Sequence, residues 1–217
     1  MVTKILLKLA KTKNLILLLQ YMFTGIITHL GKIKDIQTKT DQVYITIESD
    51  IVSKLQLGSS ISIDGVCLTV TELKEDSFEI QAMPETLRLT NLSQKSVGSK
   101  INLEMPLTLA QGLDGHIVLG HVDGVGKVTK SQRESDKNWI LEVKPPSELL
   151  KFITYKGSIT INGVSLTISS QEGETFQVSL IDYTLEKTDL SDLKEGSLVN
   201  LEIDVVARYL EKLSQNR

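Results

Sequence analysis

The stretch SISIDGVCLTV, residues 60–70, decides the fold, because the near copy SITINGVSLTI follows at residues 158–168. Both copies alternate apolar and small polar residues around an Asp-Gly or Asn-Gly pair. This pattern predicts two half-buried strands joined by a type I′ hairpin turn. After the turn stands Cys67 in the first copy and Ser165 in the second, and Thr69 or Thr167 follows on the same strand face.

The repeat extends well beyond this motif. At the same spacing of 98 residues, Thr86-Leu87 recurs as Thr184-Leu185, and Asn102-Leu103-Glu104 recurs as Asn200-Leu201-Glu202. Upstream the spacing is 95, so that Gly25, Gly31 and Lys32 match Gly120, Gly126 and Lys127. A repeated unit of about ninety residues is too long for the short modules of stacked arrays. The chain is therefore a tandem duplication of one small domain.

Short apolar stretches bounded by turn residues predict the strands of each copy. In the first copy we expect strands at 25–34, 43–49, 60–63, 66–72, 77–83 and 100–104. Helical signal is limited to 51–57, to the residues after Pro84 and, in the second copy, to 147–155. Six strands in so short a unit predict a closed Greek-key barrel. We predict an all-β protein of two tandem six-stranded Greek-key barrels followed by a C-terminal α-helix.

The duplication also sets the expected boundaries. Residues 22–115 form the first barrel and a linker, residues 116–203 the second barrel, and residues 204–217 the terminal helix. Residues 1–21 lie outside the repeat, with an apolar run too short for a membrane span and no secretory cleavage site. They are a start assigned upstream of Met22, a basic amphipathic helix or a targeting segment. We favour the first, because the duplicated unit begins at Met22.

The terminal segment has the pattern of an amphipathic helix. Asp204 is suited to cap its N-terminus, and an apolar stripe follows on one face: Val205, Val206, Tyr209, Leu210 and Leu213. Such a stripe needs a partner. It either packs on its own barrel or assembles subunits, and periodicity leaves both options open.

Composition narrows the class of protein. The chain has one cysteine, which excludes an intrachain disulfide and suits a reducing, cytoplasmic setting. Of its 24 basic residues four lie in residues 1–21, which hold no acid, so 20 basic residues face 27 acidic ones in the remainder. This acidic balance and the aromatic content of 5% argue against a nucleic-acid partner. No stretch predicts a membrane partner.

Taken alone, the candidate motifs for cofactors are weak. His116 and His121 are five residues apart, and on one strand they face opposite sides, so we expect no metal site from this pair. Gly124-Val125-Gly126 precedes no helix, so we expect no dinucleotide site.

Several motifs in order carry a resemblance to a known family. They are MFTGII at 22–27, GVCLTV at 65–70 with GVSLTI at 163–168, ETLRLTNL at 85–92, GHIVLGHVDG at 115–124 and NLEID at 200–204. Over residues 22–213 the chain resembles the riboflavin synthases, the two-domain lumazine-binding family.

The resemblance implies a transferase of riboflavin biosynthesis that needs no metal or redox cofactor. The family moves a four-carbon unit between two molecules of 6,7-dimethyl-8-ribityllumazine, giving riboflavin and 5-amino-6-ribitylaminouracil. It works as a homotrimer organised by C-terminal helices, with one lumazine per barrel, and association with lumazine synthase is a further partner to consider. The alternative is an antenna-type protein that binds lumazine or flavin without turnover.

The resemblance also implies site residues. Candidates for the chemistry are Cys67, Thr69, His121, Lys156, Ser165, Thr167 and Asp204. Expected substrate contacts of the first barrel are Gly25, Ile26, Ile27, Cys67, Leu68, Thr69, Gln81, Ala82, Met83, Pro84, Glu85 and Thr86, with Phe23 closing over the ring. Those of the second barrel are Gly120, His121, Val122, Lys156, Ser165, Leu166, Thr167, Ser179, Leu180, Ile181, Asp182, Tyr183 and Thr184.

Two positions depart from the family pattern. Asp182-Tyr183 stands where the first copy has Pro84-Glu85, which makes ligand contacts in the second barrel less certain. Met105 replaces a common arginine in the linker, which bears less on catalysis.

Overall fold

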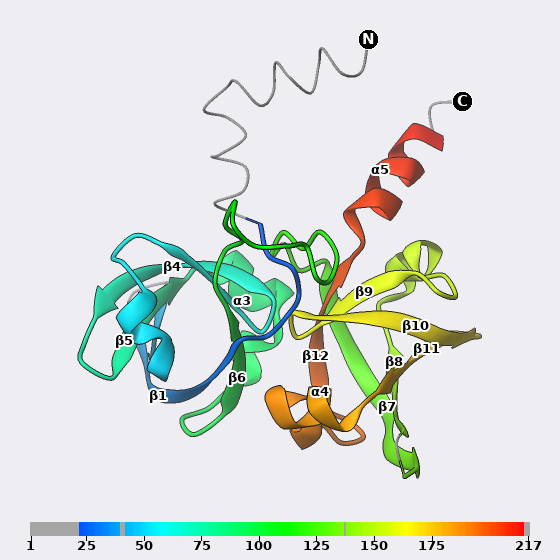
Figure 1. The fold of residues 1–217 in the computed structure, drawn as a ribbon, viewed down its shortest axis with the longest axis horizontal. Coiled ribbons are helices and arrows are strands. Elements are labelled where there is room, and N and C mark those ends of the chain that lie inside the picture. Colours follow the sequence, from blue (N-terminus) through cyan, green and yellow to red (C-terminus); the bar gives the residue numbers. More distant parts are fainter. Residues whose placement is uncertain (1–21, 40–41, 137, 215–217) are drawn as a thin grey trace.

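The computed structural model describes residues 22–39, 42–136 and 138–214, so the segment 1–21 and its three interpretations lie outside the described residues. The chain forms two closed antiparallel barrels that lie next to each other (Figure 1). The first barrel contains β1 (His29–Lys39), β2 (Gln42–Glu48), β3 (Ser60–Ile63), β4 (Val66–Leu73), β5 (Ser77–Ala82) and β6 (Lys100–Glu104). The second contains β7 (Gly124–Ser135), β8 (Asn138–Lys144), β9 (Ser158–Ile161), β10 (Val164–Glu172), β11 (Thr175–Leu180) and β12 (Leu198–Ile203).

Both barrels have the same strand order. Around the first it is β1-β2-β5-β4-β3-β6, and the second repeats it as β7-β8-β11-β10-β9-β12. The predicted fold class is confirmed, and the expected strands 60–63 and 100–104 coincide with β3 and β6. Closure leaves neither barrel with a free sheet edge.

The two hairpins that define the repeat have the predicted turns. Asp64 and Gly65 have φ of 46° and 80°, and Asn162 and Gly163 have φ of 46° and 77°. Two consecutive residues with positive φ are the mark of a type I′ turn. The two turns meet back to back, since a Cβ built on Gly65 would lie 2.7 Å from the Gly163 nitrogen.

Two stretches predicted as strand are irregular. The strand expected at 25–34 begins only at His29, because Gly25 bends the chain with a φ of 76°. Residues 116–121 make only an isolated bridge, between Val118 and Phe23, instead of a continuous strand. His116 and His121 therefore do not lie on one continuous strand, contrary to the expectation from their spacing.

Each barrel encloses its own apolar core. On β4 alternate side chains point inward, so that Val66, Leu68 and Val70 are buried. On β3, β6, β9 and β12 the polar residues between the apolar ones are buried as well, because these strands lie where the two barrels meet. Short helices cover the barrel ends: α3 (Pro84–Leu89), α4 (Asp182–Lys187) and the 3₁₀ helices η1 (Asp50–Lys54), η2 (Asn91–Gln94), η3 (Ser147–Phe152) and η4 (Asp189–Asp192). The helical stretches predicted at 51–57 and 147–155 are thus 3₁₀ turns.

A buried polar seam joins the barrels through reciprocal contacts. The Asn102 side-chain amide donates to the Asn162 carbonyl, and the Asn200 amide donates to the Asp64 carbonyl, both at 2.9 Å. Contacts that repeat in this way indicate a local two-fold relation between the two domains. Lys95 breaks the relation, since its Nζ lies 2.5 Å from Asp64 Oδ2. Leu193 occupies its place in the second copy.

The C-terminal helix α5 (Val205–Ser214) extends away from the second barrel (Figure 1). As predicted, Asp204 caps it, because Oδ1 accepts from the Val206 amide at 2.9 Å. The apolar stripe is largely exposed, with 55–66% of the surface accessible for Val206, Tyr209, Leu210 and Leu213. The stripe therefore does not pack on its own barrel. Among the described residues, no helix is long and apolar enough to cross a membrane.

Candidate functional site

The hairpin of the first barrel presents a polar outer face. On β4 the side chains of Cys67 and Thr69 point outward, because Leu68 between them points into the core. The antiparallel register places Thr69 opposite Ser60 on β3. Thr69 is exposed, so this face is open on its outer side.

The second barrel repeats this face with small changes. Ser165 and Thr167 point outward from β10, Thr167 is opposite Ser158, and Leu166 packs partly against the core. Thr167 is also exposed. The predicted pairs, Cys67 with Thr69 and Ser165 with Thr167, therefore lie on equivalent outer faces of the two barrels.

Each face is completed by a segment that crosses over from the other repeat. The Cys67 amide donates to the Gly120 carbonyl at 2.9 Å, and the Ser165 amide donates to the Gly25 carbonyl at 2.8 Å. Val122 packs against the core of the first barrel, and Ile27 against that of the second. The predicted grouping is thus wrong at these positions.

Gly25 and Ile27 contact the second barrel, at Ser165 and at the apolar core, whereas Gly120 and Val122 contact the first barrel, at Cys67 and at its core. Ile26 and His121 follow the two glycines in the chain and are exposed. Neither glycine tolerates a side chain, since an added Cβ would lie 2.6 Å from the Cβ of Ser165 or of Cys67. The close approach explains why glycine stands at both places.

Two buried glutamates hold these crossing segments. Glu104 at the end of β6 accepts from the amides of Thr24 (2.6 Å) and Gly25 (3.0 Å) and from the Thr24 hydroxyl (2.7 Å). Glu202 on β12 accepts from the amides of Leu119 (2.8 Å), Gly120 (2.9 Å) and His121 (3.0 Å).

Burial affects both carboxyl groups in the same way. Loss of solvation raises the pKa of Glu104, and it raises the pKa of Glu202 to about 7, while the accepted amide bonds act in the opposite direction. Both glutamates belong to the repeated motif Asn-Leu-Glu, but nothing in the sequence around them indicates this role.

His116 is a site residue that the sequence did not reveal. Its Nδ1 lies 2.7 Å from the Ser165 hydroxyl, and its buried Nε2 has no hydrogen-bond partner. Burial lowers the pKa of His116, and the charge of Asp204 opposes this effect. The imidazole is therefore neutral at pH 7 and able to exchange a proton with Ser165. Its partner is 49 residues away, so local sequence gives no signal of the pair.

The environment of Cys67 favours the thiol form. Burial raises the pKa of this thiol, the Ser60 hydrogen bond lowers it, and the charge of Glu202 raises it further. A thiol with a raised pKa is a hydrogen-bond donor and a poor nucleophile. The environment of Cys67 therefore favours a hydrogen-bond donor over a nucleophile.

The predicted contacts at the end of β5 divide into outward and inward side chains. Gln81 and Met83 lie on the outer face next to α3, whereas Ala82 is fully buried in the core, as is Leu180 in the second copy. Leu68, Ala82 and Leu180 therefore offer a ligand only their backbone. Pro84 starts α3, and Thr86 lies within it.

The acidic residues of the two short helices are engaged elsewhere. Glu85 accepts from Arg88 at 2.6 and 2.8 Å, which lowers the pKa of Glu85, and Asp182 accepts from Arg133 at 2.8 Å. Both α3 and α4 have six residues, so the change from Pro84-Glu85 to Asp182-Tyr183 leaves the helix in place. Ser179, Ile181, Tyr183 and Thr184 occupy the same positions around α4 as their counterparts around α3.

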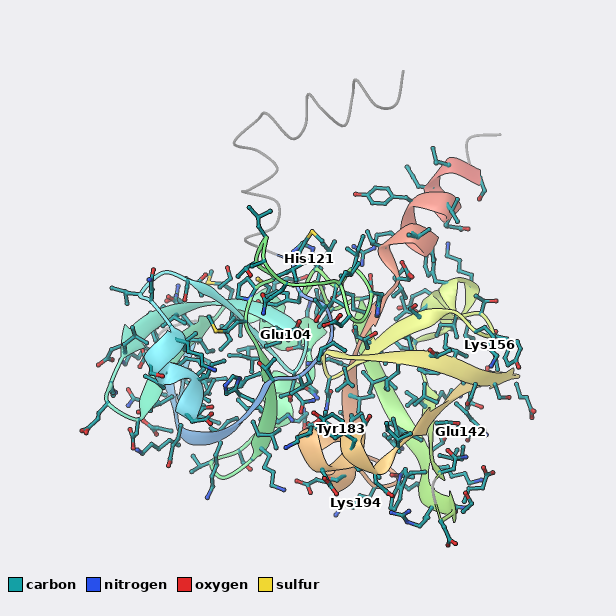
Figure 2. The ribbon with its side chains drawn as sticks, viewed as in Figure 1. Glu104, His121, Glu142, Lys156, Tyr183 and Lys194 are labelled. Atoms are coloured by element: carbon teal, nitrogen blue, oxygen red, sulfur yellow. The ribbon has the colours of Figure 1, made fainter. Side chains whose placement is uncertain are left out.

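Lys156 and Phe23 differ most from expectation. Lys156 is exposed on the turn before β9, at the outer edge of the second barrel and away from His121 (Figure 2). One chain does not bring these two side chains together. Phe23 is fully buried, so its ring is not free to close over a surface ligand as expected.

Part of the crossing segment also borders a surface hollow. Thr24 and Ile26 line it together with His29, Glu104 and the linker, around a volume of about 520 Å³. Within the described part of the chain, no group of three or more His, Cys, Asp or Glu side chains is arranged to hold a metal ion.

Comparison with known proteins agrees with this architecture. The family model described as "Lumazine binding domain" matches the chain twice, at residues 24–106 and 119–204. Riboflavin synthase of Brucella abortus is 41% identical over 200 residues, covering 89% of this chain and 98% of that protein. Riboflavin synthase of Actinobacillus pleuropneumoniae is 39% identical over 192 residues, covering 88% and 89%.

Among solved structures, LumP complexed with riboflavin superposes with a TM-score of 0.78 at 27% identity. The match covers 83% of this chain and 98% of LumP. LumP complexed with 6,7-dimethyl-8-(1'-D-ribityl)lumazine gives a TM-score of 0.74 over the same coverage. The duplicated barrel, the repeated polar face and the identity across nearly the whole chain lead to one conclusion: this chain belongs to the riboflavin synthase family of two-domain lumazine-binding proteins.

Proposed function

We propose that this protein is a riboflavin synthase that converts two molecules of 6,7-dimethyl-8-ribityllumazine into riboflavin and 5-amino-6-ribitylaminouracil. Four carbons pass from one substrate to the other, and the two products contain all atoms of the two substrates. The observation that carries the proposal is the repeated outer face. Cys67 with Thr69 and Ser165 with Thr167 stand at equivalent places on two barrels, as two identical substrates require.

Two equivalent faces account for much of the expected rate. The reacting carbons belong to two flat rings that must lie face to face, and holding both rings replaces a bimolecular encounter with a reaction between bound groups. Exposed Thr69 and Thr167 leave each face open in one chain, so a face of another subunit is able to close over it.

The side chains have distinct roles in this proposal. One lumazine loses a proton from its C7 methyl group, and the other is attacked at C7. His121 and the Ser165 hydroxyl, with His116 at 2.7 Å, are the groups that transfer protons. Thr69 and Thr167 act through water, the Cys67 thiol donates a hydrogen bond, and Lys156 and Asp204 orient the substrates.

A trimer is part of the proposal. The exposed apolar stripe of α5 supports it, because a stripe of this kind on a projecting helix is suited to packing against its copies in other subunits. A trimer also gives Lys156, at the outer edge of its barrel, a neighbouring site to reach. We place the enzyme in the cytoplasm, consistent with its single free cysteine.

The test is to mix the purified protein with the lumazine and to follow riboflavin by its absorbance. Turnover and lumazine affinity are then measured separately for Cys67→Ala, His121→Ala and Ser165→Ala. Normal turnover in all three variants would show that the site is assigned wrongly. Binding without any riboflavin would identify an antenna-type protein, and one bound ring per chain would contradict the two-site model. Sedimentation determines the oligomeric state.

A further inference from the structure

Glu104 and Glu202 have equivalent places in the two repeats, and their side chains are almost fully buried, at 4% and 2% exposure. We infer that each glutamate is a positioning residue for the substrate site of the other barrel. Glu202 belongs to the second barrel and builds the first site, while Glu104 belongs to the first barrel and builds the second. The inference rests on the proposed function for what those sites bind, and on the structure for the crossing itself.

The path from Glu202 to the first site is short. Its two carboxylate oxygens accept three consecutive main-chain amides, those of Leu119, Gly120 and His121. The carbonyl of the middle residue, Gly120, then accepts from the Cys67 amide on β4. A carboxylate on β12 thereby fixes the backbone on which His121 stands, beside Cys67 of the opposite barrel.

The mirror path starts from Glu104. Its oxygens accept from the amides of Thr24 and Gly25 and from the Thr24 hydroxyl, and the Gly25 carbonyl accepts from the Ser165 amide on β10. Ile26 follows Gly25 as His121 follows Gly120. Glu104 and His121 lie in the central region where the two barrels meet (Figure 2).

Geometry makes the carboxylate hard to replace. Gly25 and Gly120 have φ of 76° and 74°, a conformation in which successive amides point to the same side and form a nest for an anion. Glutamine fills the same volume, but its NH₂ group donates and has no lone pair for an amide hydrogen. At least one amide of each segment loses its acceptor in Glu104→Gln or Glu202→Gln.

The crossing predicts effects that a merely structural role would not produce. Loss of the Glu202 carboxylate disturbs the first site and leaves the second barrel's own face intact, although the residue belongs to the second barrel. Cys67 is the single cysteine of the chain, and its backbone is bonded to the segment that Glu202 holds. Its reaction with a thiol reagent therefore reports on the first site alone.

The experiment compares three full-length variants, Glu202→Gln, Glu104→Gln and Glu142→Gln. Glu142, on β8 of the second barrel (Figure 2), is the control, since the bonds it accepts come from the Thr129 hydroxyl and the Gln177 amide and not from a crossing segment. At pH 8, above the pKa of about 7 of Glu202, we expect Glu202→Gln to raise the rate of Cys67 labelling about tenfold or more, the change given by one lost hydrogen bond to a charged acceptor. Glu104→Gln and Glu142→Gln label at the wild-type rate.

The mirror experiment uses Ser165→Cys in a Cys67→Ser background. Here Glu104→Gln, and not Glu202→Gln, speeds the labelling. Equal labelling in all variants, or acceleration in the residue's own barrel, would overturn the inference. If Glu202→Gln does not fold, Glu202→Asp keeps the charge but withdraws it by one methylene. In Glu202→Asp the thiol reagent should label Cys67 at a rate between those of the wild type and Glu202→Gln. Labelling at the wild-type rate would refute the inference that Glu202 positions the first site.

Turnover separates this inference from the proposed function. If the wild type forms riboflavin, Glu104→Gln and Glu202→Gln should each lower its rate about tenfold or more, with Glu142→Gln unchanged. A wild type that forms no riboflavin refutes the proposed function, while the labelling result still decides whether the glutamates act across the barrels.

Discussion

The contact between the two hairpin turns can be tested with two glycines of nearly identical backbone. Gly65 has φ of 80° and lies at the seam, and Gly58 has φ of 81° and lies at the surface of the same barrel. A Cβ on Gly65 would be 2.7 Å from the Gly163 nitrogen and 3.0 Å from its Cα, whereas a Cβ on Gly58 has no atom within 4 Å. Alanine at either position adds the same conformational strain.

The expected magnitudes follow from these contacts. A left-handed alanine costs about 1–2 kcal/mol, and the restricted unfolded chain returns about 0.4–1 kcal/mol, so Gly58→Ala should lower the free energy of unfolding only modestly. At Gly65 the added Cβ would clash with backbone atoms of Gly163, and backbone atoms cannot relieve the clash by a change of rotamer. Overpacking of this kind adds about 1–3 kcal/mol. We therefore expect Gly65→Ala to be about 1–3 kcal/mol less stable than Gly58→Ala.

Urea unfolding followed in two ways provides the assay. Circular dichroism reports on both barrels, and fluorescence of Trp139, the single tryptophan, reports on the second barrel. Because the seam is buried and hydrogen-bonded, Gly65→Ala in the first barrel should shift the Trp139 transition as well. Equal losses for Gly58→Ala and Gly65→Ala would refute the close contact. An unshifted Trp139 transition would refute the coupling of the barrels.

Three further outcomes follow. Lys95→Met leaves two buried carboxylates without their cation and should lower the free energy of unfolding by about 3–5 kcal/mol, whereas Lys100→Met, which breaks an exposed pair, should lower it by less than about 1 kcal/mol; urea titration compares them. The pKa of Glu202 rises from 4.5 to about 7 on folding, so its contribution to stability is complete below about pH 4.5 and is lost as the pH rises to about 7. The free energy of unfolding of the wild type, relative to Glu202→Gln, should fall by roughly 3 kcal/mol over that range, and a pH-independent difference would contradict the raised pKa. Tyr209→Glu on the exposed stripe should leave the unfolding midpoint unchanged but shift sedimentation toward the monomer.

The two barrels could be predicted from the sequence because the patterns that specify their strands and turns lie between neighbouring residues. An Asp-Gly or Asn-Gly pair between alternating residues specifies the turn, and the strands of the repeated motif begin and end where the alternation does. The sequence did not predict that residues 23–27 and 118–122 each pack on the barrel of the other repeat. A duplication shows which positions are equivalent, but it does not show whether a segment packs on its own barrel or on the other. The contact between His116 and Ser165 was missed for the same reason, because no periodicity in the sequence predicts a contact between these two positions.

The crossing also gives the two sites different chemistry, which a dismutation requires. Two identical lumazines in identical environments have no reason to differ, yet one must give up carbon and the other accept it. The two copies differ at the position after the glycine of each crossing segment. His121 follows Gly120 in the segment bonded to Cys67, and Ile26 follows Gly25 in the segment bonded to Ser165. Ser165 in turn has His116 at 2.7 Å. The first site thus combines a thiol with an exposed imidazole, and the second a hydroxyl with a buried neutral imidazole. In the proposed function, the duplicated fold supplies two matching places for the rings, and we expect these substitutions to make the two rings react differently.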